Sequence, residues 1–242
     1  MPIKVAMCLI LFFTVAFRVD AQEKDTEVEA RLRFNLWVQS SPQGMQTTGA
    51  GVAKKKERYQ GSFFLKNGEK LTEVSYRQGR RTGEVTYKGG EECVLYKKGA
   101  EDVPLVELCK FRLPKSGKYL VLLRTSGTAK DPVFKPILIP HDKSHLKKGR
   151  VLFVNYTNLK LGLVLDAKRK LALQPNAMKS LLLKDAKAAG VHIEMHTKAK
   201  GDKEWQVVES KGYSINHESK SACILYQEKK GGPVKMKFFT GL

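Results

Sequence analysis

The sequence lacks the patterns that indicate helices, common catalytic motifs and metal sites. No stretch of the 242 residues sustains a hydrophobic period of 3.6, which argues against a helical fold. The chain has no Gly-rich phosphate loop, no nucleophile elbow and no cysteine–histidine spacing typical of zinc. We therefore expect an all-β protein with no cofactor and no bound metal.

Long apolar runs are also scarce. Residues 5–17 form one apolar run of 13 residues behind Lys4, whereas a helix that spans a bilayer needs about 20. Small residues at Val19 and Ala21 then match the −3 and −1 positions of a cleavage site. The sequence predicts a signal peptide over 1–21, a flexible leader over 22–27 and no transmembrane segment in the mature chain. The expected location is periplasmic, cell-surface or extracellular.

Cysteine is rare, and removal of the signal peptide leaves only Cys93, Cys109 and Cys223. An oxidising compartment allows one disulfide among three cysteines. Cys93 and Cys109 lie on runs that predict neighbouring antiparallel strands, so their pairing is the preferred bridge. The alternative is that all three are small buried hydrophobic residues, which is common for free cysteine. The sequence leaves both interpretations open.

Acidic residues are few beside basic ones. The chain has 24 Asp and Glu against 44 Lys and Arg, a net charge of +20. Loss of Lys4, Arg18 and Asp20 with the signal peptide leaves +19 on 221 residues, because two positive charges and one negative charge are removed. Lysine dominates over arginine, which argues against planar, bidentate recognition of phosphate. Most of these charges are expected to solvate sheet faces and edges.

Some basic residues cluster at predicted turns, and these are the candidate binding residues: Arg80, Arg81, Lys147, Lys148 and Arg150. The abundant polyanions outside a cell are acidic polysaccharide, lipopolysaccharide and released DNA. Binding to any of them would release counterions and weaken with salt. Aromatic residues are not interleaved with the clusters, so stacking on single-stranded bases is not expected.

The chain is rich in short strand patterns, and residues 150–183 show them most clearly. Four strands of four to seven residues are joined there by connections of two to four residues, which predicts a β-meander of antiparallel neighbours. A proline-flanked segment at 137–139 is predicted to be an edge strand or an extended crossing. Further strands are predicted at 32–38, 62–66, 71–77, 83–88, 93–97, 103–113, 119–124, 191–197, 205–210, 213–217, 222–227 and 234–239.

This pattern predicts an all-β fold, an antiparallel β-sandwich over residues 28–242. The sandwich could be one large unit or two small halves. The polar, proline-flanked segment 126–149 is the candidate seam between halves. No internal repeat is evident in the sequence.

Three polar motifs suggest chemistry. His192 and His196 flank Glu194, but the alternation of Val191, Ile193 and Met195 predicts a strand, on which the two histidines would lie roughly 13 Å apart, too far to share one ion. His141, Asp142 and His145 are the candidates for a hydrolase, although a triad is defined by geometry. Asn155-Tyr156-Thr157 fits the N-glycosylation pattern but ends a predicted strand.

The second half resembles a family of uncharacterised exported bacterial β-sandwich proteins. The resemblance runs over 118–242 and rests on the segments 118–123, 137–142, 149–157 and 171–175. The position after Pro175 is usually Gly in that family and is Asn176 here. Asn also tolerates a left-handed backbone, so the turn is still expected. The resemblance implies export and a β-sandwich, and it implies no catalytic or ligand-binding residue.

The function expected from the sequence is an exported, non-catalytic binding or structural β module that contacts an acidic polymer. The alternative is a hydrolase acting on an envelope or extracellular polymer. An enzyme needs titratable groups that converge in a pocket, whereas a binding module can show only a basic or aromatic face.

Overall fold

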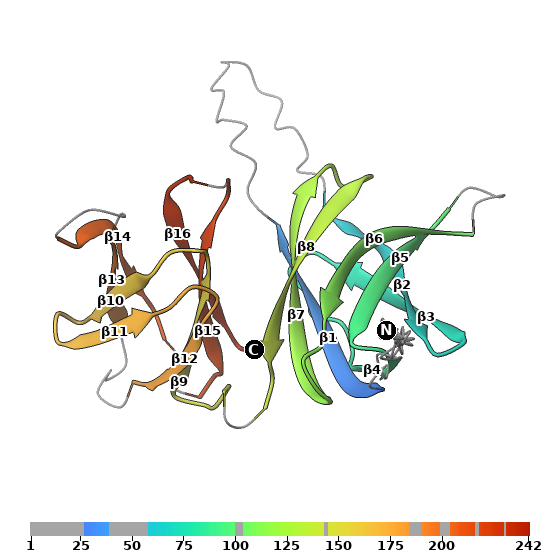
Figure 1. Cartoon of the computed structure of the whole chain (residues 1–242), viewed down its shortest axis with the longest axis horizontal. Helices are drawn as coiled ribbons and strands as arrows, with labels where there is room; N and C mark the ends of the chain where they lie inside the picture. The colour runs from blue at the N-terminus through green and yellow to red at the C-terminus, as the bar shows by residue number, and fades with distance from the viewer. Residues whose placement is uncertain are drawn as a thin grey trace, which may run out of the picture.

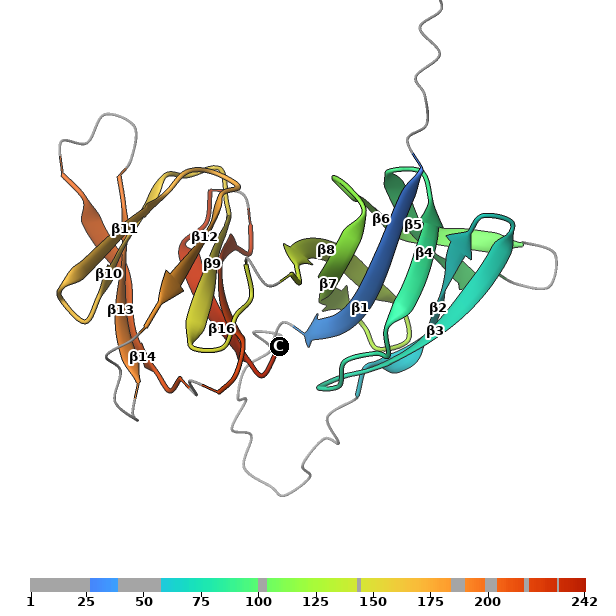
Figure 2. The same cartoon turned by 90° about the horizontal axis from the view of Figure 1, so that it is seen from below.

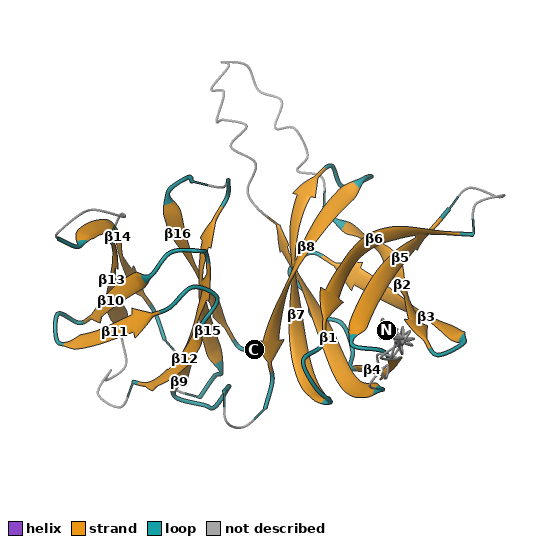
Figure 3. Cartoon of the chain, in the orientation of Figure 1, coloured by secondary structure: helices purple, strands orange, loops and turns teal. Residues whose placement is uncertain are grey.

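The computed structural model describes residues 27–38, 58–99, 104–142, 145–183, 190–198, 204–215, 218–229 and 231–242. The predicted signal peptide, most of the leader and residues 39–57 lie outside these ranges. The described residues contain sixteen strands and no helix, so the predicted all-β fold is confirmed (Figure 3). No described helix could therefore cross a membrane.

The strands form two units that lie side by side (Figure 1). The first unit contains β1 (Val28–Val38), β2 (Gln60–Asn67), β3 (Lys70–Arg77), β4 (Val85–Gly89), β5 (Glu92–Lys98), β6 (Leu105–Arg112), β7 (Gly117–Gly127) and β8 (Pro132–Pro140). The second contains β9 (Arg150–Tyr156), β10 (Leu161–Leu165), β11 (Arg169–Leu173), β12 (Met178–Leu182), β13 (Val191–Thr197), β14 (Gln206–Tyr213), β15 (Ser221–Gln227) and β16 (Val234–Thr240).

Each unit is a sandwich of two four-stranded sheets, and the two units have the same topology. The first unit has sheets of order β4-β1-β7-β8 and β3-β2-β5-β6. The second has sheets of order β12-β9-β15-β16 and β11-β10-β13-β14, which is the first set with eight added to every strand number. The chain is thus a tandem repeat of one eight-stranded fold.

Local irregularities repeat as well as strand order. The β5–β6 register shifts between Leu95 and Tyr96, and the equivalent β13–β14 register shifts between Met195 and His196. Both bulges follow a fully buried core residue. The sequence does not reveal this repeat, because the units share the alternation of buried and exposed positions more than they share residues.

The sandwich is not purely antiparallel. β1 pairs in parallel with β7, and β9 pairs in parallel with β15, at the centre of their sheets. A parallel pair needs a long connection between its strands, and here the rest of each unit supplies it. These pairings therefore lie outside what short-range turn signals can predict.

Residues 150–183 form the four predicted strands but not a meander. β10 and β11 form a hairpin in the outer sheet, while β12 returns to pair with β9 in the inner sheet. The prediction of successive neighbours was therefore wrong for β9–β10 and β11–β12. The chain crosses between the two layers after Tyr156 and again near Asn176, where φ is 56°. The left-handed conformation expected for Asn176 is confirmed.

Other features also lie where the Gly and Pro residues predicted them. Asn67-Gly68 was predicted to close a hairpin, and Gly68 has a φ of +61° between β2 and β3. β8 is bounded by Pro132 and Pro140 and lies at the edge of its sheet, where missing N–H donors cost least.

Each unit encloses its own hydrophobic core, and a third hydrophobic core, the seam core, lies between the units. It joins the outward faces of β7 and β8 to those of β9 and β15 and contains Trp37, Leu120, Leu122, Ile137, Ile139, Leu146, Leu152, Val154, Ala222, Ile224, Tyr226 and Leu242. β7 and β15 are consequently buried on both faces. The chain passes from one unit to the other between Pro140 and Arg150, within the segment 126–149 expected as the seam.

The contacts across the seam are reciprocal. The ring of Trp37, at the end of β1, lies 5.6 Å from that of Phe239 on β16. Tyr156, at the end of the equivalent β9, donates from its hydroxyl to Pro136 O on β8, at 3.4 Å. Arg124 lies over the Tyr226 ring, 5.8 Å from its centroid. In these contacts β1 meets β16 and the equivalent β9 meets β8, so equivalent strands exchange roles across the seam. This is the pattern that an approximate two-fold axis produces, as in an isologous dimer interface.

Candidate functional site

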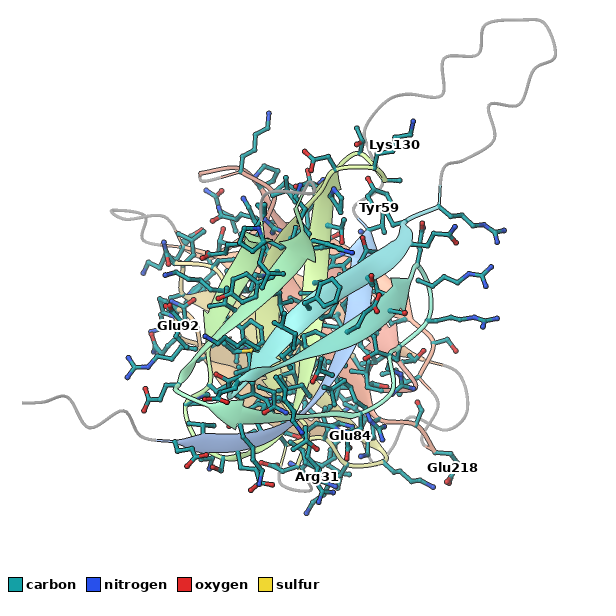
Figure 4. All side chains as sticks on the ribbon, turned by 90° about the vertical axis from the view of Figure 1, so that its right-hand side faces the viewer. Arg31, Tyr59, Glu84, Glu92, Lys130 and Glu218 are labelled. Atoms are coloured by element: carbon teal, nitrogen blue, oxygen red, sulfur yellow. The ribbon has the colours of Figure 1, made fainter. Side chains whose placement is uncertain are left out.

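Basic side chains from both units come together at one end of the seam. We call this set the basic cluster: Arg33 on β1, Arg81 after β3, Lys118 on β7, His141 after β8 and Lys220 before β15. Seen from below, the C-terminal residues lie between the two units (Figure 2). Figure 4 shows Arg31, Glu84 and Glu218 at the end of the molecule opposite Lys130, and Glu84 forms an ion pair with Arg33 of the cluster.

His141 lies at the centre of this cluster. Its backbone N–H donates to Lys118 O at 2.8 Å, which holds the residue at the end of β8. Its Nε2 lies 3.5 Å from the Nζ of Lys220. Partial burial, followed by the charges of Lys220, Arg33, Arg81 and Lys118, lowers the pKa of His141 below its usual 6.5. The lowered pKa favours the neutral imidazole, whose ring nitrogen can accept a hydrogen bond from Lys220.

The two arginines of the basic cluster are held differently. Arg33 forms an ion pair of 3.5 Å with Glu84, yet its Nε is buried without a hydrogen-bond partner among the described residues. Arg81 donates from its guanidinium to the carbonyl of Gly241, which links the first unit to the end of β16. A buried polar atom that lacks a partner is uncommon and calls for a physical explanation.

Only one of the basic residues predicted from the sequence belongs to this cluster, namely Arg81. Arg80 and Lys147 are exposed on turns, as expected. Lys148 forms an exposed ion pair of 3.3 Å with Glu218. Arg150 donates from Nε to Ser180 Oγ at 2.9 Å and from Nη2 to Ser180 O at 3.0 Å, so it joins β9 to β12.

Sequence reasoning missed Arg33, Lys118 and Lys220. Arg33 and Lys118 each have one Lys or Arg within three residues, Arg31 and Lys115, and Lys220 has none, so none of them belongs to a run of adjacent basic residues. Residues 118 and 220 are 102 positions apart, and only the packing of β7 against β15 brings them near the same histidine.

The hydrolase candidates separate into a pair formed by Asp142 and His145, and His141, which contacts Lys220. His145 contacts Asp142 through Nδ1 and through its backbone N–H, both at 2.9 Å from Oδ1. This pattern is typical of a turn in which an aspartate side chain accepts a hydrogen bond from the backbone N–H three residues later. His141 faces Lys220 instead. Residues 143 and 144 lie outside the described residues.

The predicted strand through His192 and His196 is confirmed as β13. Glu194 lies between the histidines, with its carboxylate 3.8 Å from His192 Nε2 and 3.6 Å from His196 Nε2. Among the described residues, no group of three or more His, Cys, Asp or Glu side chains is arranged to hold a metal ion. These side chains instead lie on the outer face of the sheet. The Trp205 ring packs there against the backbone of Gly162, so close that a Cβ at this glycine would lie 3.4 Å from the ring.

A cavity of about 490 Å³ lies at the edge of the first unit. Its lining includes Tyr119, Leu138 and Pro140, with Met178 contributed by the second unit. The charged side chains at its wall, Glu91 and Arg112, are hydrogen-bonded to each other at 2.7 Å. Since they neutralise one another, the cavity offers little to recognise an anion.

The disulfide predicted between Cys93 and Cys109 is not present, and all three described cysteines are free. In the β5–β6 register Cys93 faces Phe111, while Cys109 faces Leu95. The two cysteines are thus diagonal neighbours, which lie about 7–8 Å apart in antiparallel pairs. This is beyond the usual Cα separation of a disulfide, about 4.4–6.8 Å. The alternative interpretation, small buried thiols, fits the structure.

We expect thiol titration of the unfolded mature protein to find three free cysteines. In the folded protein Cys93 and Cys223 should react slowly, because both are fully buried and burial raises their pKa values. Cys109 is partly exposed, with its pKa raised to about 12, and should react first. Ellman's reagent with and without denaturant measures this. A count of one thiol in denaturant would show that a bridge forms.

Asn155 cannot serve as a glycosylation acceptor in the folded chain. Its side chain is fully buried, and it donates from Nδ2 to Leu159 O at 2.7 Å and to Gln174 O at 2.8 Å. Its Oδ1 accepts from the backbone N–H of Thr157 at 3.1 Å and from the Thr157 hydroxyl at 2.7 Å. The motif is therefore structural, and it fixes the corner where the chain leaves β9.

A scan against protein-family models and a search of curated proteins gave no match to this chain. The functional interpretation therefore rests on the site itself.

Proposed function

We propose that this protein is an exported, non-catalytic binding module that holds an acidic polysaccharide through its basic surface. The observation that carries the proposal is the basic cluster at the seam, where five basic side chains from five segments surround one end of the interface. The net charge of +19 on the mature chain, residues 22–242, adds a favourable long-range potential for any polyanion.

The type of basic residue favours polysaccharide over nucleic acid. Most of the positive charges are lysines, which act as hydrated point charges, whereas arginine provides the planar fork suited to phosphate. No aromatic side chain belongs to the basic cluster, so it offers no stacking platform for bases. Carboxylate and sulfate groups along a sugar chain need only spaced positive charges.

Heparin chromatography of the mature chain, residues 22–242, tests this function. We expect elution from heparin above physiological salt, about 0.15 M. Binding should weaken linearly on a log–log plot of affinity against salt, because counterions are released. Retention on a neutral dextran column should be absent, which separates charge recognition from general adhesion.

Three outcomes would contradict the proposal. Elution from heparin at or below physiological salt would mean that the positive charge only keeps the protein soluble and does not bind polysaccharide. Tighter binding to duplex DNA or to lipopolysaccharide vesicles than to heparin at equal salt would assign another ligand. Release of new reducing ends from the polysaccharide would show that the protein is a hydrolase.

A further inference from the structure

We propose that the basic cluster at the seam is a discrete oxyanion site that binds one sulfate or carboxylate group and bridges the two units. This inference rests on the proposed function and identifies where the polysaccharide is held. The ligand is a tetrahedral or planar oxyanion, which inorganic sulfate can represent in solution.

The first argument is that the fold gathers cationic residues of both units around one histidine. Lys220 Nζ lies 3.5 Å from His141 Nε2, and the backbone N–H of His141 donates to Lys118 O at 2.8 Å. Arg81 donates to the carbonyl of Gly241, the neighbour of the residue whose N–H bonds Lys220 O. Arg33, Arg81, Lys118 and Lys220 all lie close enough to His141 to lower its pKa. Like charges brought together destabilise a fold unless counter-charge is supplied. Three acids near the cluster already have basic partners: Glu84 pairs with Arg31 and Arg33, Glu218 pairs with Lys148, and Asp142 contacts His145. An anion at the cluster would supply the missing counter-charge.

The second argument is that the basic cluster has hydrogen-bond donors to spare. Within the described part of the chain, Arg33 Nε is buried and has no hydrogen-bond partner. Lys220 Nζ carries three N–H donors, and it lies at the long distance of 3.5 Å from the one acceptor nitrogen of His141. An oxyanion has several acceptor lone pairs and can satisfy donors from more than one of these side chains.

The third argument is the symmetry of the repeat. Val121 and Leu123 of β7 match Cys223 and Leu225 of β15 as residues that face their own unit's core. This match makes Lys118 and Lys220 equivalent positions of the two units. Their carbonyls also accept equivalent bonds, Lys118 O from His141 N at 2.8 Å and Lys220 O from Leu242 N at 3.0 Å. The two lysines therefore approach the end of the seam from opposite sides, as a clamp on one ligand would require.

Paired variants test the site. We expect Lys118→Gln with Lys220→Gln to lower the log–log salt slope of heparin binding by about two. The matched control, Lys168→Gln with Lys170→Gln on the distant β10–β11 hairpin, removes the same charge and should change the slope little. Thermal melting of both double variants confirms that each is folded.

The outcomes separate this inference from the proposed function. If the wild-type chain is not retained on heparin, the proposed function fails. If the wild type is retained but both double variants lose equal binding, the charge acts diffusely and the discrete site is overturned while the function stands.

A second measurement uses the unaltered protein. Bound sulfate stabilises the protonated imidazole, so it should raise the pKa of His141 relative to chloride at equal ionic strength. The ring-proton signals of His192, which is exposed on β13, serve as the reference for a general salt effect. Titration of the histidine ring protons by NMR gives both values, and an unchanged His141 would overturn the site.

The pH dependence of heparin affinity also tests whether the anion lies beside His141. Because the anion favours protonated His141, heparin affinity should rise as pH falls through the pKa of this residue, which lies below 6.5. His141→Gln should remove that rise while leaving the lysine contribution intact. An equal pH dependence in wild type and variant would show that other groups are responsible.

Discussion

Replacing Asn155 with Asp should lower the free energy of unfolding by about 3 kcal/mol or more. The substitution keeps the size of the side chain and the oxygen that accepts from Thr157. It replaces the Nδ2 donor with a second oxygen, which then faces the carbonyls of Leu159 and Gln174. Each buried carbonyl left without a donor costs about 1–3 kcal/mol, and a buried carboxylate costs more. Since domains are stable by about 5–15 kcal/mol, this loss is large.

Asn158→Asp is the matched control for this change. Asn158 lies three residues away on the same corner and is exposed. Its substitution should alter stability by no more than about 0.5 kcal/mol, as is usual for surface positions. Urea denaturation of both variants gives the two free energies. Similar small losses would mean that the Asn155 network does not hold the corner together.

Truncating Leu122 at the seam is expected to have the second large effect. Leu122 is fully buried on the face of β7 that packs against the second unit. Leu122→Ala should lower the free energy of unfolding by about 2–5 kcal/mol, because it removes buried methyl groups and leaves a cavity. In a chain of this size the melting temperature should fall by about 4–20 °C.

Leu71→Ala provides the comparison for the seam. Leu71 is 48 % exposed on β3 of the first unit, outside the seam core. Its truncation should shift the melting temperature by only a degree or two. Calorimetry of the two variants decides the question. Equal shifts would show that solvent reaches the outward face of β7, which faces the seam, and the two units would then be only loosely associated.

The tandem repeat explains why the seam can form a binding site shared by both units. Equivalent faces of two equivalent units cover each other, so one chain contains the kind of interface that a two-fold dimer forms between two chains. Residues far apart in the sequence, such as Lys118 and Lys220, come together at this interface. A site on an axis of this kind contacts both units at once, and its occupation should stabilise their association.

Most strands, many of their turns and the all-β class could be predicted from the amino-acid sequence. The separate strands predicted at 205–210 and 213–217 were wrong, since one strand, β14, runs through Gln206–Tyr213. Alternating buried residues such as Leu161, Leu163 and Leu165 mark a strand whatever its partner is. Asn67-Gly68 and Asn176 mark turns because their backbones accept positive φ. Strand alternation and turn residues depend only on neighbours a few positions away, so they can be recognised without knowing how the rest of the chain folds.

The pairing of the strands, the placement of the thiols and the convergence of charge depend on the tertiary structure. β9 pairs with β12 and β15, not with β10, because a strand can hydrogen-bond with any compatible edge and local pattern does not select it. One register places Phe111 instead of Cys109 opposite Cys93. His141 meets Lys220 across 79 residues only because two hydrophobic sheet faces exclude water from each other. Burial of apolar surface is non-directional, so its final geometry depends on the whole fold.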